Sequence, residues 1–98
     1  MKIIEREPYA EATNYLWELR PADEKLSVHR DPWRSTYNEC AKSLGFWRPN
    51  NNPKSKILGW TEIPKTKEAH IKLGEAMESK GLEVEVHKTW FHYMNFIR

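Results

Sequence analysis

Histidine and acidic side chains are the first candidates for chemistry in this chain, as metal ligands or as proton donors and acceptors. The histidines are His29, His70, His87 and His92. None has the helical i, i+4 spacing or the paired cysteines of a zinc site. Glu83, Glu85 and His87 would share one face of a strand, but neighbouring side chains there start about 6.6–7 Å apart, too wide for a tight chelate. We therefore predict a solvated face, with no metal and no cofactor.

Nucleophilic catalysis would need a reactive cysteine or a serine–histidine–aspartate arrangement. Cys40 falls on the apolar stripe of a predicted helix, where a buried thiol behaves as a small inert hydrophobe. Ser27, His29 and Asp31 alternate along an extended segment, which places them beyond the hydrogen-bond reach of a triad, about 2.6–3.2 Å. The four glycines stand singly, so no glycine-rich loop is available to cradle a phosphate. We predict no catalytic residues.

Positive charge concentrates in the middle of the sequence. Residues 25–67 hold nine bases against three acids, a net of +6, whereas residues 1–24 carry −3 and residues 68–98 carry −1. Such asymmetry indicates a surface for a polyanion or an acidic protein. The alternative interpretation is that folding scatters these charges over the whole surface.

Two segments of this basic region, 29–34 and 46–50, combine tryptophan with arginine, and the second leads into two lysines. Arginine and lysine neutralise phosphates, asparagine bonds base edges, and aromatic rings stack on unpaired bases. Tryptophan and arginine are equally common anchors of protein interfaces. The predicted partner-binding residues are Trp47, Arg48, Asn51, Lys54 and Lys56, with Arg30 and Arg34. The last two join the others only if the helix that follows them starts beside the loop.

A non-enzymatic binding protein is therefore the leading hypothesis: a small intracellular regulator or inhibitor that acts on a larger protein or complex, with a protein partner favoured over nucleic acid. The first alternative is a nucleic-acid-binding module that uses the basic loop 47–56. The second is a small RNase that uses His29, His87 or His92 with arginine and glutamate. A single cysteine suits a cytoplasmic location. No apolar run approaches the roughly 18 residues that span a bilayer, so no membrane partner is expected.

The elements that position these residues follow from apolar periodicity. Residues 2–6 predict a strand. Residues 9–19 predict a helix, because apolar side chains recur at spacings of three and four: Ala12, Tyr15, Leu16 and Leu19. Residues 25–30 predict an edge strand or an extended loop. A second helix is expected after Asp31, which can cap it, with Pro32 at its first position and Gly45 at its end.

Beyond the second helix, residues 47–56 are rich in proline and asparagine and predict a loop. Residues 57–63 predict a strand in which Gly59 marks a bulge or a close backbone approach. A third helix is expected from a Thr66 cap to Gly81, with Gly74 as a close-packing point. Alternating apolar residues predict a further strand from residue 82 onward.

Large apolar side chains occupy both faces of this last strand after residue 88. A straight strand over 82–97 would extend about 50 Å at roughly 3.3 Å per residue, so we expect a bend, bulge or break near 87–90. The same pattern predicts a central strand or an end that docks on something else. The aromatic residues Trp60, Trp90, Tyr93 and Phe96 build a core or, alternatively, some of them form a patch for partner binding or homodimerisation.

Together these elements predict one α+β domain over residues 1–98. Its architecture is a two-layer sandwich, with a small mixed or antiparallel sheet of about 3–4 strands and about three helices on one face.

Overall fold

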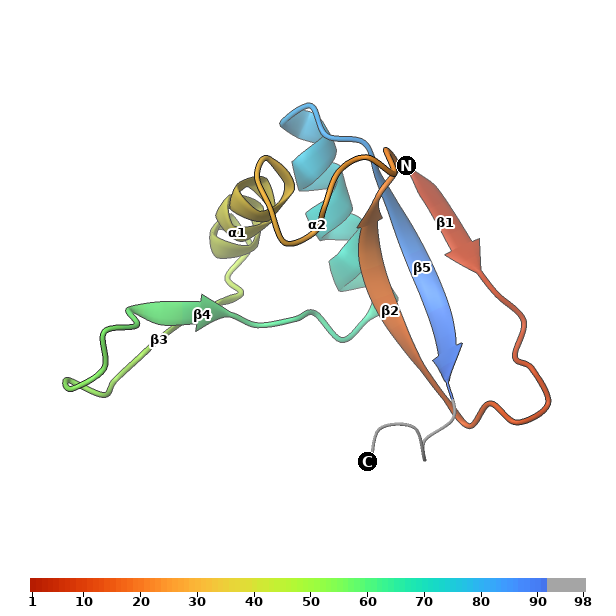
Figure 1. The fold of residues 1–98 in the computed structure, drawn as a ribbon, viewed down its shortest axis with the longest axis horizontal. Helices are drawn as coiled ribbons and strands as arrows, with labels where there is room; N and C mark the ends of the chain where they lie inside the picture. Colours follow the sequence, from red (N-terminus) through yellow and green to blue (C-terminus); the bar gives the residue numbers. More distant parts are fainter. Residues whose placement is uncertain (92–98) are drawn as a thin grey trace.

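A computed structural model of the chain describes residues 1–91. Over this range the chain forms two helices and five strands (Figure 1): β1 (Lys2–Glu5), β2 (Asn14–Pro21), α1 (Trp33–Ser43), β3 (Trp47–Pro49), β4 (Gly59–Thr61), α2 (Lys67–Ser79) and β5 (Val84–Phe91). Three strands form a mixed sheet in the order β1-β5-β2, and β3 pairs with β4 in a separate two-stranded sheet. The α+β class and the mixed sheet are as predicted.

β5 is the central strand of the main sheet. It runs parallel to β1 and antiparallel to β2, and the same residue, Val86, pairs with Ile3 on one side and Leu19 on the other. The central position predicted from its apolar faces is confirmed. The register with β2 continues without interruption to Phe91, so the bulge or break expected near 87–90 does not occur. The aromatic residues expected after Phe91 lie outside the described residues.

The helix predicted over residues 9–19 is wrong, because residues 14–21 form β2. The apolar side chains fit two periods at once: Tyr15, Trp17 and Leu19 also alternate, as one face of a strand requires. Aromatic residues favour strands. Eight consecutive residue pairs with β5 stabilise the strand rather than the helix. The described chain therefore has two helices rather than three.

Between β2 and α1 the chain makes turns and no strand, so residues 25–30 form the loop alternative. The loop predicted over 47–56 begins with the short strand β3, and the strand predicted over 57–63 is shortened to β4. Pairing between these two short strands turns the region into a hairpin.

The predicted Thr66 cap of α2 is confirmed, whereas the N-cap of α1 is Pro32 rather than the predicted Asp31 and makes no side-chain cap hydrogen bond. The Thr66 hydroxyl accepts a hydrogen bond from the Ala69 N–H at 3.1 Å and so caps α2. The Asp31 carboxylate accepts one from the Ser35 N–H at 3.1 Å, near the start of α1. Pro32 occupies the N-cap position, so this helix starts one residue later than predicted.

Both helices also end at the predicted glycines. Gly45 and Gly81 have φ angles of 89° and 94°, which side chains disfavour. After α2 the Leu82 N–H donates to the Met77 carbonyl at 3.2 Å, which is the wide bond of a Schellman motif. The same arrangement closes α1 at Gly45. These ends fix the lengths of both helices.

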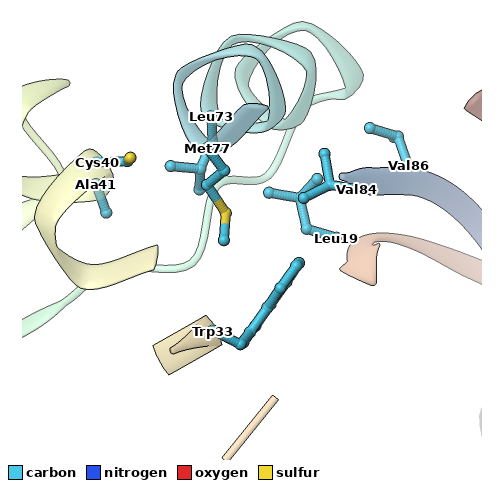
Figure 2. Packing of buried hydrophobic residues seen from close by; sticks show 8 residues of the cluster. All are labelled: Leu19, Trp33, Cys40, Ala41, Leu73, Met77, Val84 and Val86. Carbon is cyan, nitrogen blue, oxygen red and sulfur yellow. The ribbon is translucent and has the colours of Figure 1, made fainter. Parts of the chain in front are cut away.

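The core lies between α2 and one face of the main sheet, with α1 packed on α2 (Figure 2). Its buried side chains are Leu19, Trp33, Cys40, Ala41, Leu73, Met77, Val84 and Val86. Gly74 of α2 permits this close contact, because an added Cβ there would lie 2.5 Å from the Met1 sulfur and 3.0 Å from a Val84 methyl. The close-packing role predicted for Gly74 is confirmed.

Candidate functional site

The β3–β4 hairpin projects away from the helices and the main sheet (Figure 1). Its strands pair antiparallel, with Arg48 opposite Trp60 and Pro49 opposite Gly59. The projection agrees with a radius of gyration of 15.2 Å, against about 13 Å for a compact chain of 100 residues. This hairpin contains the region that the sequence selects for partner binding.

The tip of the hairpin is held by its own asparagines. The Asn50 N–H donates to the Leu58 carbonyl at 2.9 Å, and the Asn50 side chain donates to the Ile57 carbonyl at 3.0 Å. The Asn50 and Asn52 side chains also accept backbone N–H groups two residues later, each at 3.0 Å, as asparagine does in turns. These bonds order the loop, and Asn51 stands exposed between them.

Trp47 and Arg48 hold the base of the hairpin. The Trp47 ring lies against Gly59, on the far strand, and the Lys42 ammonium lies 4.3 Å from the ring centroid. The close approach predicted at Gly59 is confirmed. The Arg48 guanidinium donates to the Gly45 carbonyl at 3.1 Å and pairs with Glu62 at 3.0 Å. Both residues therefore contribute to the shape of the hairpin as well as to its surface.

Uncovered apolar side chains are the feature of the hairpin that sequence reasoning missed. Leu58 is 85% exposed and Ile57 is 64% exposed, and Trp60 and Ile63 are 52% and 74% exposed. Ile57, Leu58 and Trp60 belong to the hairpin and are called its apolar patch below, whereas Ile63 follows β4 in the chain. The sequence predicts residues 57–63 as a strand of a sheet with helices on one face, so the only signal of this exposure was the alternative in which Trp60 belongs to an exposed aromatic patch.

Unpaired positive charge borders this apolar patch. Lys54 and Lys56 are exposed, and within residues 1–91 no carboxylate lies within ion-pair distance of either. Residues 47–65 hold four bases against one acid, a net of +3. The hairpin thus presents aliphatic groups beside free ammonium groups.

The structure does not bring Arg30 and Arg34 to the hairpin. They lie at the N-terminal end of α1, whereas the hairpin follows its C-terminal end. The Arg34 guanidinium donates to the Val28 carbonyl at 2.9 Å and lies 4.9 Å from the Tyr37 ring centroid. It thereby ties the loop before α1 to the helix, while Arg30 is exposed on that loop.

Of the three histidines in residues 1–91, His29 and His70 line the same cavity and His87 lies elsewhere. His29 is exposed in the loop before α1, and His92 lies outside the described residues. His87, on β5, has its Nε2 3.0 Å from a Glu85 carboxylate oxygen. In the part of the chain that the structure describes, no group of three histidine, cysteine or acidic side chains could hold a metal ion.

His70 is buried, and within residues 1–91 neither ring nitrogen has a hydrogen-bond partner of good geometry. It is 2% exposed on the inner side of α2. Burial lowers the pKa of His70, and the nearby Pro64 carbonyl and Glu18 carboxylate offset this only in part. The imidazole is therefore neutral at neutral pH.

A large open cavity lies beside β2, and His70 is among the residues around it. Its volume is about 1170 Å³, and its walls come from β2, α1, the loop between them and the segment leading into α2. All residues from 15 to 21 line it, so side chains of both faces of β2 border the same space. A strand can do this only by presenting its edge to the cavity.

Two aromatic side chains at the far end of the main sheet, Tyr15 and Trp90, have partners within the chain. The Lys88 ammonium lies 4.5 Å from the Tyr15 ring centroid and 4.9 Å from that of Trp90. The Trp90 indole N–H donates to the Arg6 carbonyl at 2.6 Å. Cation–π contacts of this kind occupy the aromatic faces, so this end is less open to a partner than the hairpin.

Comparisons of the chain with protein-family models, curated proteins and solved structures found no match. Neither helix in residues 1–91 is long and apolar enough to cross a membrane.

Proposed function

We propose that this chain is a small non-enzymatic binding protein that docks on a larger protein through its β3–β4 hairpin, as a regulator or inhibitor. The observation that supports this best is the exposure of Ile57, Leu58 and Trp60 on a projecting hairpin. Leaving aliphatic surface in water costs about 25 cal/mol per Å², which burial against a partner recovers. Trp60 supplies the kind of anchor that dominates protein interfaces.

The partner surface that fits the hairpin is an apolar pocket with carboxylates at its rim. The aliphatic tip fills the pocket, and Lys54 and Lys56 then meet acidic side chains beside it. Charges at the rim of an interface mainly increase the association rate and the choice of partner. Affinity would come from the apolar tip, and partner choice from the lysines.

A protein partner is favoured over nucleic acid because the most exposed hairpin side chains are aliphatic. Leu58 and Ile57 offer neither hydrogen bonds to base edges nor a ring that stacks on a base. Two free lysines would also give a weak phosphate contact, since DNA-binding proteins that depend on charge neutralise about 6–10 phosphates. Binding of oligonucleotides by the loop 47–56 stays the alternative.

Affinity capture with matched variants tests this proposal. The purified chain, immobilised, is exposed to an extract of the cells that express it, and bound proteins are quantified by mass spectrometry. The test variant is Ile57→Ser with Leu58→Ser, and the control is Tyr9→Ser, which changes a residue that is 50% exposed away from the hairpin. We expect a protein that binds the wild type and the control and is lost from the test variant.

Two results would overturn the proposal. One is a captured protein that binds the hairpin variant as well as the wild type. The other is tight, salt-sensitive binding of single- or double-stranded oligonucleotides that requires Lys54 and Lys56, which would establish the nucleic-acid alternative. Thermal unfolding of each variant shows that the fold is retained.

A further inference from the structure

The main sheet ends at β2, whose outer backbone edge is open. The Ala22 N–H donates to the Glu83 carbonyl at 3.1 Å, which fixes which residues of β2 bond to β5. Antiparallel pairs alternate, so with the uniform register the N–H and C=O groups of Tyr15, Trp17 and Leu19 point away from β5. Within residues 1–91, none of these three makes a backbone hydrogen bond outside the sheet.

Pro21, the last residue of β2, agrees with this assignment of outward-facing backbone groups. Pro21 pairs with Val84 in the same register class as Leu19, so its ring nitrogen also faces outward. Proline is tolerated in sheets where its missing N–H would face away from the ladder. The edge therefore offers three N–H donors, those of Tyr15, Trp17 and Leu19. It also offers four carbonyl acceptors, those of the same three residues and Pro21.

The space beside this edge is the cavity of about 1170 Å³ described above, called the slot from here on. Tyr37 of α1 and Ile63 of the segment before α2 line the side opposite β2. Trp33 and His70 lie beneath this lining, with only 1% and 2% of their surfaces exposed. An occupant of the slot thus meets an unpaired strand edge and the apolar side chains of Tyr37 and Ile63.

We propose that an extended peptide segment of a partner protein enters this slot and adds to β2 as a fourth strand of the main sheet. Strand addition uses backbone hydrogen bonds for affinity and alternate side-chain pockets for selectivity. Alternate residues of the segment face Tyr37 and Ile63, and these are apolar. The other residues face the Glu18–Arg20 ion pair, and these are polar.

A single strand fits this slot better than a second copy of the chain. Edge-to-edge pairing places strands about 4.8 Å apart. In a pair of identical copies, each copy's own α1 wall would have to share that space with the other copy's β2. The slot shares Ile63 with the exposed apolar side chains near the hairpin, but it uses none of Ile57, Leu58 and Trp60, so it can be tested separately from the proposed docking function.

The test starts from a phage-displayed library of peptides as long as β2, which has 8 residues. Selected peptides are titrated into the full chain while backbone amide exchange is followed by NMR. In the free protein, the amides of Leu16, Glu18 and Arg20 should exchange slowly and those of Trp17 and Leu19 quickly. Peptide binding should slow the fast pair at least about tenfold, as new hydrogen bonds require.

Two matched controls separate strand addition from binding by side chains alone. N-methylation of the peptide at residues that face β2 should weaken binding about tenfold or more, whereas methylation at the intervening residues should not. Tyr15→Pro removes both the side chain and one outward backbone N–H. Tyr15→Ala removes the side chain and keeps that N–H. Only the proline variant should weaken binding beyond the loss of the ring.

Selected peptides that bind without slowing the exchange at Trp17 and Leu19 would overturn the proposal, as would equal affinity of both N-methylated series. A library that yields no binder also counts against it. If these amides exchange more slowly as the concentration of the peptide-free protein increases, and sedimentation shows a dimer, the edge would be assigned to a second copy instead.

Discussion

The indole of Trp47 occupies the space that a side chain at Gly59 would need, across the two strands of the β3–β4 hairpin. An added Cβ at Gly59 would also lie 2.5 Å from the Arg48 carbonyl oxygen, which cannot move without shifting the strand. The hairpin therefore keeps its shape because a large ring on β3 faces an absent side chain on β4. This contact joins the base of the hairpin to the tip.

Gly59→Ala should loosen the hairpin and leave the main sheet intact. Forcing a methyl group into packed space costs about 1–3 kcal/mol, and here the cost falls on a two-stranded unit that has little stability of its own. Amide exchange at Asn50 and Glu62, which bond within and at the base of the hairpin, should become faster. Thr61→Ala is the control, and equal exchange rates in both variants would contradict the proposed contact.

Substituting alanine for the buried Leu73 and for the exposed Leu58 should have very different effects on the free energy of unfolding. Leu73 is fully buried and Leu58 is 85% exposed. Leu73→Ala should lower the free energy of unfolding by about 2–5 kcal/mol, and Leu58→Ala should change it by less than about 0.5 kcal/mol. Urea unfolding measures both. A large loss from Leu58→Ala would mean that this side chain packs on the body and is not available to a partner.

Acidification should destabilise the fold through His70. Burial lowers the pKa of His70 below the value of 6.5 that it has in the unfolded chain. Below pH 6.5 the unfolded chain binds a proton that the folded chain does not, so stability falls as the pH decreases from 6.5 toward the lowered pKa. The slope contributed by one such group reaches about 1.4 kcal/mol per pH unit.

Urea unfolding of the wild type and of His70→Gln across this range checks the prediction. The glutamine variant lacks the titrating group, so its stability should depend less on pH between 6.5 and the lowered pKa. Identical pH dependence in both proteins would show that another group is responsible.

Cys40 should resist thiol reagents while the chain is folded. Its side chain is 2% exposed, and burial is the main cause that raises the pKa of the thiol. The reactive thiolate is therefore scarce as well as shielded. Reaction with a chromogenic disulfide should be slow in buffer and fast in denaturant, and fast labelling in buffer would require an open path to α1.

Local signals in the sequence were sufficient for the helix ends and insufficient for the sheet. Thr66 and Gly81 act on neighbouring backbone groups, so their roles can be predicted from a short window. β2 could not be predicted that way, because its apolar residues fit both a helix and a strand. Pairing with β5, about seventy residues later along the chain, decides between them.

The candidate sites divide in the same way. Lys54 and Lys56 could be picked from charge alone, since lysine is almost always exposed. The exposure of Leu58 could not, because it depends on whether any element covers the hairpin. The slot beside β2 was also beyond prediction, since its walls come from separate parts of the chain and its edge exists only once strand order is known.

The order β1-β5-β2 also has a consequence for biosynthesis. The two strands that flank the centre are made first, and the strand that joins them is made last of the three, from Val84 onward. At roughly 5–20 residues per second of translation, β1 and β2 must wait several seconds without a neighbour. The emerging chain therefore carries two strands whose common partner has not yet been made.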